Sequence, residues 1–259
     1  MDTRSLFRAY RGAERRVFLL DYDGTLRELC PTPAEAAPTA EIMELLRALA
    51  ADPKNTVVVV SGRDAATLTV WLGDLPLHLI AEHGLAYRAP GGAWQSLSPA
   101  SDASSWKSRV REYMNHSVTA APGSFIEEKS ASLAWHYRVA DQADAEKAQA
   151  ELLVALKSLT RQAGLRVLNG NKVIEIQPGN ISKGKNTYQW LGSPKADFML
   201  AAGDDVTDED LFASLPSHAW TIKIGKQLST ARYRLESPAT LRAILSAFGR
   251  QPKNQAHDS

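Results

Sequence analysis

Two aspartates lie directly after a short apolar run near the start of the chain. The run Val17 to Leu20 is followed by Asp21 and Asp23, and then by Gly24 and Thr25. Ligands of open α/β sheets bind at the carboxyl ends of strands, so we expect both carboxylates to face a ligand from a loop there. Gly24 lets the chain turn sharply, and Thr25 offers a hydroxyl and an amide to a bound phosphate. The pair alone is ambiguous, because it also occurs in metal-dependent glycosyltransferases and because aspartates stabilise turns.

Three later segments carry groups that phosphate chemistry uses, and we expect each of them to follow a strand of the same sheet. Ser61 follows the apolar run Val57 to Val60 and offers a hydroxyl and the next amide to a phosphate oxygen. Lys183 is a cation that can hold a carboxylate against an anionic substrate. The third segment is acidic and offers the carboxylate oxygens that Mg2+ prefers, from Asp204, Asp205 and Asp208.

The apolar runs that precede these residues predict buried parallel strands. Strands are expected at Val17 to Leu20, Val57 to Val60, His78 to Ala81 and Phe198 to Ala202, and helices at Thr39 to Ala50, at Asp64 to Leu72 and from about Thr207. This alternation of strands and helices is typical of a doubly wound, Rossmann-like parallel sheet, so the predicted fold class is α/β.

The pattern changes near residue 100, where the segment Ser98 to Ser105 is rich in small polar residues and predicts a linker. The following residues predict an α+β unit, with helices at Trp106 to Met114 and Ala143 to Arg161 and strands at Phe125 to Lys129, Ser132 to Arg138, Leu165 to Asn169 and Lys172 to Gln177. We therefore divide the chain into a core, residues 1–102 and 180–259, and an inserted smaller domain, residues 103–179. The cleft between them is the expected ligand site.

The composition argues against several classes of protein. The 259 residues include 30 basic and 29 acidic ones, so no net field favours nucleic acid. No apolar run approaches the roughly 20 residues that span a bilayer. The basic start lacks the apolar stretch of a secretory signal, so we expect a cytoplasmic protein that binds no membrane. The single cysteine, Cys30, rules out an intramolecular disulfide and is expected to pack. The oligomeric state is left open, with a monomer as the expectation.

Together the motifs resemble those of the haloacid dehalogenase superfamily, and within it those of the trehalose-6-phosphate phosphatases. The resemblance extends from Val17 to Ala213 and rests on the segments LLDYDGTL, VVVVSGR, AEHG, EKSASLAWHYR, VLNGNKVIEIQP, SKGK and GDDVTDEDLF. It implies a magnesium-dependent phosphatase whose core carries an inserted cap domain. The superfamily motifs imply the class of reaction, whereas the motifs of the inserted domain imply the sugar.

The resemblance implies a role for each residue of the core site. Asp21 would attack phosphorus and become an aspartyl phosphate, while Asp23 would protonate the leaving oxygen and later activate water. Mg2+ would be held by the side chains of Asp21 and Asp204 and by the main-chain carbonyl of Asp23. Ser61 and Lys183 would bind the phosphoryl oxygens, and Thr25 would lie beside them.

Two further acidic residues keep alternative interpretations. Asp208 is expected to orient a metal-bound water, although Thr207 and Asp210 fit the box of residues that begins a helix, in which case Asp208 only helps to cap it. Asp205 is either a direct metal ligand or a partner of one.

For the inserted domain the resemblance implies a grip on the sugar hydroxyls, supplied by Glu127, Lys129, Arg138 and Glu175. Charges on strands of alternating exposure otherwise form a solvated face, and Glu128 competes with Glu127 for the role. His83, which precedes a glycine, either faces the sugar or is a turn residue. Trp135 and His136 should lie on opposite faces of one strand, and we place neither in the site.

The leading hypothesis is therefore hydrolysis of trehalose 6-phosphate to trehalose and inorganic phosphate. A phosphatase for sucrose phosphate or mannosylglycerate phosphate is the nearest alternative, because the core would be the same and only the grip on the sugar would differ. A metal-dependent glycosyltransferase explains neither Lys183 nor the second acidic cluster. A catalytically silent sensor of sugar phosphates would be expected to lack parts that are present here.

Overall fold

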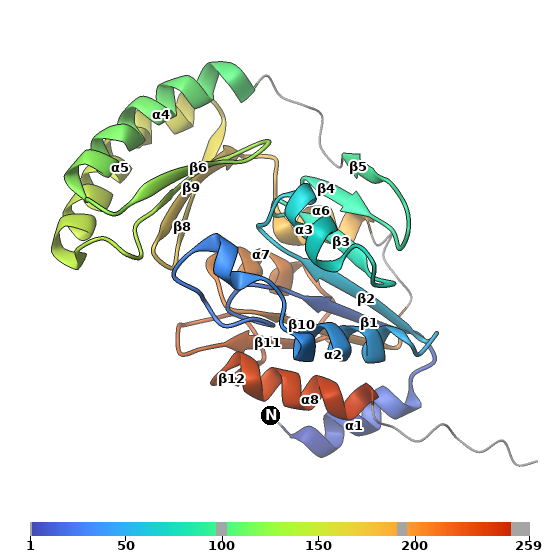
Figure 1. The fold of residues 1–259 in the computed structure, drawn as a ribbon. Helices are drawn as coiled ribbons and strands as arrows, with labels where there is room; N and C mark the ends of the chain where they lie inside the picture. Colours follow the sequence, from blue (N-terminus) through green and yellow to red (C-terminus); the bar gives the residue numbers. More distant parts are fainter. Residues whose placement is uncertain (1, 97–102, 191–195, 250–259) are drawn as a thin grey trace, which may run out of the picture.

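The computed structural model describes residues 2–96, 103–190 and 196–249, which build two sheets with their own helices (Figure 1). The larger sheet takes strands from both ends of the chain, and the smaller sheet, from the middle of the chain, stands over one end of it. The predicted linker Ser98 to Ser105 lies mostly outside the described residues. The division into a core and a cap at residues 102 and 179 stays a prediction, and "cap" is used below for the unit that contains the small sheet.

The large sheet has the strand order β12-β11-β10-β1-β2-β3-β4-β5. Neighbours from β12 to β3 are parallel, whereas β4 and β5 are antiparallel to their neighbours. The strands are β1 (Arg16–Leu20), β2 (Asn55–Val60), β3 (His78–Ala81), β4 (Ala86–Arg88), β5 (Trp94–Ser96), β10 (Phe198–Gly203), β11 (Trp220–Ile224) and β12 (Tyr233–Leu235). The predicted parallel α/β sheet is confirmed, and β4, β5, β11 and β12 are additions that the apolar runs did not indicate.

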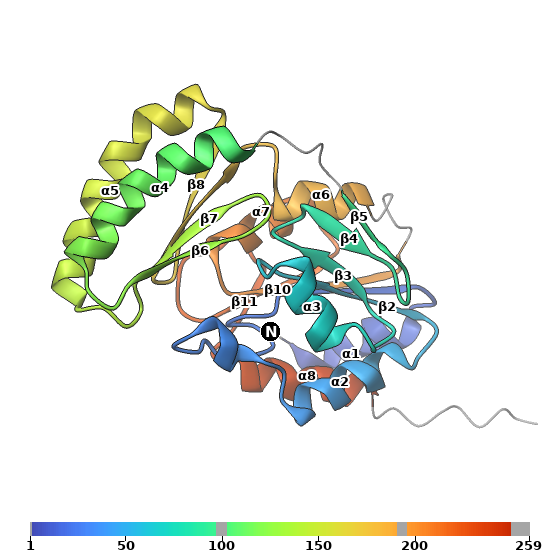
Figure 2. The ribbon, with the colours of Figure 1, turned by 45° about the horizontal axis from the view of Figure 1, so that its top comes forward.

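Helices cover both faces of this sheet, as Figure 2 shows. Alternate residues of β1 point to opposite sides, so Phe18 and Leu20 join one hydrophobic cluster while Val17 and Leu19 join another. The first cluster includes side chains of α1 (Thr3–Gly12), α2 (Ala40–Ala50), α3 (Ala65–Leu72) and α8 (Pro238–Gly249). The second includes side chains of α6 (Lys183–Trp190) and α7 (Val206–Ser214).

Polar side chains determine where two of these helices begin. The Thr39 hydroxyl accepts a hydrogen bond from the amide of Ile42 before α2, and the Asp64 carboxylate accepts one from the amide of Thr67 before α3. Each side chain satisfies an amide that has no partner within the helix. The helices therefore start one residue later than the apolar pattern predicts.

The small sheet is antiparallel throughout and has the order β6-β7-β9-β8. Its elements are α4 (Ala103–Ala120), β6 (Phe125–Glu128), β7 (Leu133–His136), α5 (Gln142–Gln162), β8 (Leu165–Gly170) and β9 (Val173–Pro178). Both helices lie on the face away from the large sheet (Figure 1) and enclose a separate hydrophobic cluster around Trp135. The other face of the small sheet is turned toward the carboxyl ends of the parallel strands.

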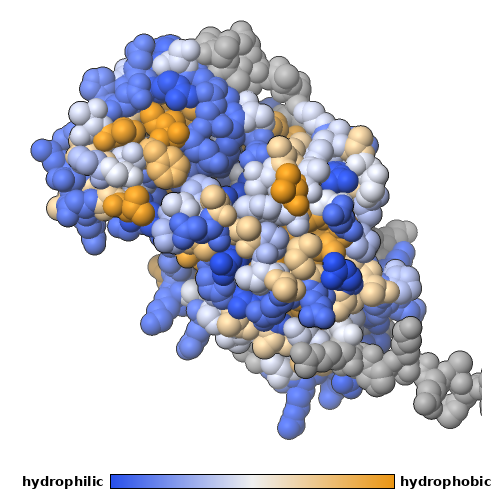
Figure 3. Space-filling view, in the orientation of Figure 1, coloured by the Kyte–Doolittle hydropathy of each residue, from blue (hydrophilic) through white to orange (hydrophobic). Residues whose placement is uncertain are grey.

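The surface carries no large apolar area in the view of Figure 3, where hydrophobic side chains form small separate groups among hydrophilic ones. Among the helices of the described ranges, none combines the length and the apolar character needed to cross a bilayer.

The contact between α6 and α7 depends on a glycine. A Cβ added at Gly184 would lie 1.9 Å from the carbonyl oxygen of Asp210 and 2.6 Å from the Ser214 hydroxyl, whereas a Cβ at Gly12 would meet nothing within 4 Å. We expect Gly184→Ala to lower the free energy of unfolding by about 1–3 kcal/mol, because backbone atoms cannot move aside cheaply. Gly12→Ala should leave it unchanged or slightly higher. Denaturant unfolding of both variants checks this, and equal midpoints would contradict the predicted close contact.

Candidate active site

Asp21 and Lys183 form a buried ion pair at the carboxyl end of β1. Lys183 Nζ lies 2.5 Å from Asp21 Oδ1 and 2.6 Å from Asp208 Oδ1, and the lysine side chain is 1% exposed. Burial would lower the pKa of Lys183, but the charges of Asp208 and Asp21 raise it above its ordinary value. The lysine therefore stays charged, and it draws two carboxylates together.

The position of Lys183 in the fold differs from the expected one. We expected it to follow a strand of the large sheet, but it is the first residue of α6 and follows the small sheet after a short connection. Its side chain still reaches Asp21, because α6 packs beside the carboxyl ends of the parallel strands. A helix terminus thus takes the place that the sequence pattern assigned to a strand end.

Three carboxylates gather where β1 and β10 end. Asp21, Asp204 and Asp208 each offer one oxygen, and these oxygens lie within 4.8 Å of one another. Burial, and then the charge of Asp208, raise the pKa of Asp21 to about 7 despite the opposing charge of Lys183. Burial and the charge of Asp21 likewise raise the pKa of Asp204. Such a group of oxygens is suited to a hard divalent cation, which would relieve the repulsion.

Two further observations fit a cation at this place. Asp21 Oδ2 is buried and has no hydrogen-bond partner among the described residues. A Cβ at Gly24, whose φ is +78°, would lie 2.1 Å from Asp204 Oδ2, so the turn after Asp23 must be a glycine for the second carboxylate to approach. Asp21 and Asp204, whose side chains are predicted to hold Mg2+, therefore lie together with Asp208, and one oxygen of Asp21 is unpaired.

Asp23 is held by Arg63, a residue to which the sequence patterns assigned no role. The guanidinium donates two hydrogen bonds to the carboxylate, Nε to Oδ2 at 2.8 Å and Nη2 to Oδ1 at 2.7 Å. It also lies over the Trp71 ring at 4.9 Å and donates to the carbonyl of Pro33. Such a fork fixes the orientation of a carboxylate. The segment Ser61-Gly62-Arg63 was the signal that could have identified it.

Ser61 and Thr25 are both buried. The hydroxyl of Ser61, a residue that is 1% exposed, accepts a hydrogen bond from the Arg63 amide at 3.1 Å. The Thr25 hydroxyl is buried without a hydrogen-bond partner among the described residues. Neither side chain is among those that line the pocket above the carboxylates.

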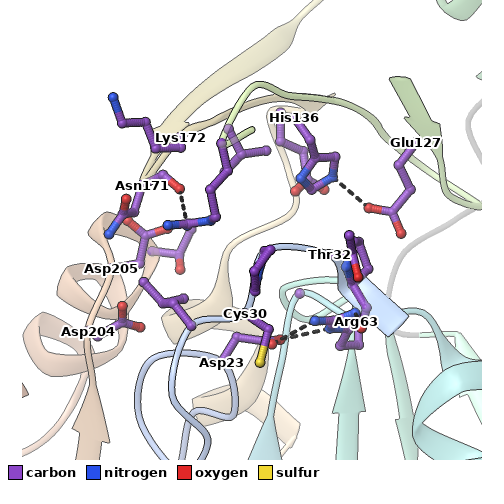
Figure 4. A pocket seen from close by; sticks show the side chains of 18 of the residues that line it. Asp23, Cys30, Thr32, Arg63, Glu127, His136, Asn171, Lys172, Asp204 and Asp205 are labelled. Carbon is purple, nitrogen blue, oxygen red and sulfur yellow. Dashed lines mark hydrogen bonds and ion pairs between the residues drawn. The ribbon is translucent and has the colours of Figure 1, made fainter. Parts of the chain in front are cut away.

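A pocket separates the carboxylates from the small sheet (Figure 4). Its floor includes Asp21, Asp23, Arg63, Asp204 and Asp205, and its roof includes Glu127, Lys129, His136, Arg138 and Glu175. The sequence analysis placed four of these five roof residues in the site. Side chains from the two sheets therefore face each other across one cavity.

Glu175 is the most strongly held charge of the roof. It is 5% exposed and lies 3.0 Å from Lys129 Nζ, 2.5 Å from the Ser132 hydroxyl and 3.4 Å from His83 Nε2. Burial would raise the pKa of Glu175, but Lys129 and His83 lower it below its ordinary value. His83 thus lines the pocket as well as forming a turn, and its contact with a sugar stays a prediction.

Glu127 and Arg138 also reach the pocket. His136 Nε2 lies 2.8 Å from Glu127 Oε2, and Arg138 donates to the carbonyl of Asn171 at 2.7 Å (Figure 4). Leaving His136 outside the site was wrong, because the strand face opposite Trp135 is the one that lines the pocket. Glu128 does not compete with Glu127, since Glu128 pairs with Arg111 instead.

Asp208, in the first turn of α7, both caps this helix and pairs with Lys183. Asp208 Oδ2 accepts a hydrogen bond from the Asp205 amide, while its Oδ1 faces Lys183, so capping and charge pairing do not exclude each other. The helix-start box consists of Asp205 and Asp208 rather than of Thr207 and Asp210. Asp210 instead pairs with Arg166 of β8, because its side chain points toward the small sheet. Asp205 lines the pocket.

Cys30 does not pack in the core as expected. It is partly buried, lines the pocket near Asp23, and its thiol lies 3.4 Å from the carbonyl oxygen of Glu28.

The fold is shared with a haloacid dehalogenase-like hydrolase from Bacillus subtilis, which superposes with a TM-score of 0.55 at 13% identity and with coverage of 88% of this chain and 97% of that one. The chain belongs to the trehalose-phosphatase family, whose model matches residues 19–240.

Two relatives and one solved structure show the extent of the similarity. The chain is 43% identical over 233 residues to a bifunctional trehalose-6-phosphate synthase/phosphatase of Thermoproteus tenax, covering 90% of this chain and 32% of the relative. It is 39% identical over 232 residues to a trehalose-phosphatase of Saccharomyces cerevisiae, covering 81% and 26%. The C-terminal domain of trehalose-6-phosphate phosphatase from Candida albicans superposes with a TM-score of 0.91 at 30% identity, covering 96% and 97%. The chain thus spans about a third or less of these curated relatives.

We expect the contacts of Glu175 with Lys129 and His83 to make the stability of the cap sensitive to acid. The pKa of Glu175 is lower in the folded chain than the unfolded value of about 4.3, so its contribution to stability is present above that pH and is lost as the pH falls below it. We expect Glu175→Gln to lower the free energy of unfolding by about 3 kcal/mol near neutral pH, and by progressively less below about pH 4. Thermal unfolding at several pH values measures this.

The matched control is Glu151→Gln, which changes an exposed residue of α5. It should leave the pH profile of unfolding unchanged. If Glu175→Gln and the parent chain lost stability in parallel as the pH fell, Glu175 would not be the charge responsible.

Proposed function

We propose that this chain hydrolyses trehalose 6-phosphate to trehalose and inorganic phosphate in trehalose biosynthesis. The observation that carries the proposal is the buried carboxylate and lysine cluster, which opens into a pocket whose opposite wall is a second sheet with charged and hydrogen-bonding side chains. Membership of the trehalose-phosphatase family supports the choice of sugar. A phosphate would lie on the floor of the pocket and the sugar would extend toward the roof.

Asp21 is the proposed nucleophile. Lys183 pairs with Oδ1 and fixes the carboxylate, so one oxygen of Asp21 would attack phosphorus while the other could bind the cation. The new bond joins Asp21 to phosphorus, while the bond between phosphorus and the sugar oxygen breaks. Lys183 also offsets the negative charge of the phosphoryl group during the transfer.

Asp23 is the proposed general acid and base. It would give a proton to the leaving sugar oxygen and later accept one from the water that attacks the aspartyl phosphate, which releases phosphate and restores Asp21. Arg63 keeps the Asp23 carboxylate in a single orientation through its two hydrogen bonds. Ser61 and Thr25 would contribute hydroxyls near the phosphoryl oxygens.

Mg2+ is the proposed cofactor. The side chains of Asp21 and Asp204 and the main-chain carbonyl of Asp23 would hold it, with Asp205 and Asp208 in support. When bound, it would neutralise charge on the carboxylates and on the phosphate.

The roof would recognise the sugar. Its charged donors and acceptors are suited to sugar hydroxyls and to the phosphate, and they come from Glu127, Lys129, Arg138 and Glu175. His136 lines the same pocket. The near balance of 30 basic and 29 acidic residues favours a small-molecule substrate over nucleic acid. We further propose a cytoplasmic enzyme that is active as a monomer.

Release of phosphate from a panel of sugar phosphates tests this function. We expect kcat/KM for trehalose 6-phosphate to exceed that for sucrose phosphate and mannosylglycerate phosphate by more than about tenfold, equivalent to about 1.4 kcal/mol of transition-state binding. The Asp21→Asn variant should lose nearly all turnover while the chain still folds, because an amide is a poor nucleophile. Equal rates on all three substrates would reject the sugar assignment, and an active Asp21→Asn would reject the nucleophile.

Binding of Mg2+ should be visible without any substrate. At about 100 times its dissociation constant, the ion should stabilise the folded chain by about 2.7 kcal/mol, which shifts the midpoint of thermal unfolding by several degrees. Asp204→Asn should abolish most of this shift, because it removes one of the three clustered carboxylates. Glu151→Gln, far from the cluster, should keep it. A shift that survives in Asp204→Asn would place the ion elsewhere.

A further inference from the structure

Three consecutive residues after β3 have left-handed backbone conformations. The φ angles are +46° at Glu82, +55° at His83 and +102° at Gly84. Glu82 and His83 are not glycines, and residues with a side chain seldom adopt such angles. Left-handed conformations of such residues cost about 1 kcal/mol or more each, and they persist only where surrounding contacts hold them. Contacts with other parts of the molecule must therefore stabilise this turn between β3 and β4.

The backbone of the turn is bonded to the loop that contains the proposed phosphate-binding residues. The amide of Glu82 donates to the carbonyl of Arg63 at 2.9 Å, and the amide of His83 donates to the carbonyl of Ser61 at 3.0 Å. A Cβ at Gly62 would lie 2.6 Å from the His83 ring, so the imidazole packs directly on this loop. The turn and the loop thus behave as one unit of the core.

The side chains of the same turn are directed to the cap. The carboxylate of Glu82, which is 5% exposed, accepts hydrogen bonds from the Ser130 hydroxyl and, at 3.1 Å, from the Ala131 amide. Both donors lie in the turn between β6 and β7. His83 Nε2 lies 3.4 Å from Glu175 of β9. Two adjacent residues of the core therefore hold two different strands of the roof.

The turn that Glu82 holds connects residues of the sugar-binding wall. Ser130 and Ala131 lie between Lys129 and Ser132, and the amide of Lys129 donates to the carbonyl of Ser132 at 3.0 Å to close the turn. The side chains of Lys129 and Ser132 both contact Glu175. A displacement of this turn would therefore displace the Lys129 and Glu175 pair with it.

We propose that Glu82 and His83 are positioning residues that align the sugar-binding strands of the cap with the phosphate-binding loop of the core. The proposal rests on the proposed function, since it assumes that one substrate contacts both walls of the pocket. Strand β9 of the small sheet joins the core through a short connection to α6, and the side-chain contacts of Glu82 and His83 add to this link. A misplacement of about 1 Å can reduce a rate by about 100-fold when a substrate must be held in line.

The test compares two substrates in five variants. We expect Glu82→Ala to lower kcat/KM for trehalose 6-phosphate by about 10–100-fold, but that for p-nitrophenyl phosphate, which is too small to contact both walls, by less than about threefold. Glu82→Gln should stay within about threefold of the parent on both substrates. Its carbonyl can accept from the Ala131 amide, and its amide can donate to the Ser130 hydroxyl, which can act as an acceptor.

Ser130→Ala tests the same contact from the cap side. It removes one of the two donors, so it should cause a smaller loss of the same kind, and the double variant with Glu82→Ala should lose no more than Glu82→Ala alone. The matched control is Glu128→Gln, which changes a neighbouring carboxylate of the same hairpin that pairs with Arg111. It should leave the ratio of the two kcat/KM values unchanged.

The outcomes separate this inference from the proposed function. If the parent chain did not prefer trehalose 6-phosphate to the other sugar phosphates, the proposed function would fail before any variant was compared. If the parent showed that preference but Glu82→Ala lost equally on both substrates, or Ser130→Ala and Glu82→Ala losses were additive, the positioning role would be overturned. If Glu82→Ala does not fold, Ser130→Ala decides the question alone, and an unchanged substrate ratio in it would overturn the role.

Discussion

The pairing of Lys183 with both Asp21 and Asp208 is the interaction on which the rest of the site depends. The lysine is almost fully buried, and a buried cation is stable only while carboxylates of matching geometry face it. The pairs connect the end of β1 with the starts of α6 and α7. Lys183 follows β9 by only a few residues in sequence, so the chain passes directly from the small sheet to the ion pairs at the end of β1. The two parts of the pocket are thereby connected through the backbone as well as across the cavity.

The same cluster shows how one side chain can serve both the fold and the site. Asp208 begins α7 with one carboxylate oxygen and holds Lys183 with the other. The close approach of Gly24 to Asp204 brings a further negative charge beside Asp21, at a cost that appears as the raised pKa of both carboxyl groups. Such crowding of like charges is unfavourable for folding, and it is the arrangement that a divalent cation would stabilise.

The two walls of the pocket use electrostatics differently. On the floor, carboxylates outnumber the cations that pair with them, which favours a metal ion. On the roof, Glu175 is matched with Lys129 and lies near His83, so its charge is compensated before any ligand is present. Arg63 and Asp23 form a further ion pair on the floor. The proposed sugar phosphate would place its phosphate near the cation on the floor and its hydroxyls against the roof.

Local patterns of the sequence were sufficient for four of the six parallel strands and for most of the charged residues on the two walls of the pocket. Apolar runs of four or five residues identify β1, β2, β3 and β10 because both faces of those strands are buried, and the polar residues after them must then share one edge of the sheet. The strands β4, β5 and β12 were not predicted, because they are short and partly exposed and their sequences therefore lack a clear hydrophobic pattern. Tertiary structure alone decided that Arg63 binds Asp23, that His136 faces the pocket, that Asp208 both caps α7 and holds Lys183, and that Glu82 reaches the cap. The first and third of these contacts depend on how strands and helices pack within the core, and the other two depend on how the two sheets are placed. A one-dimensional pattern contains neither placement.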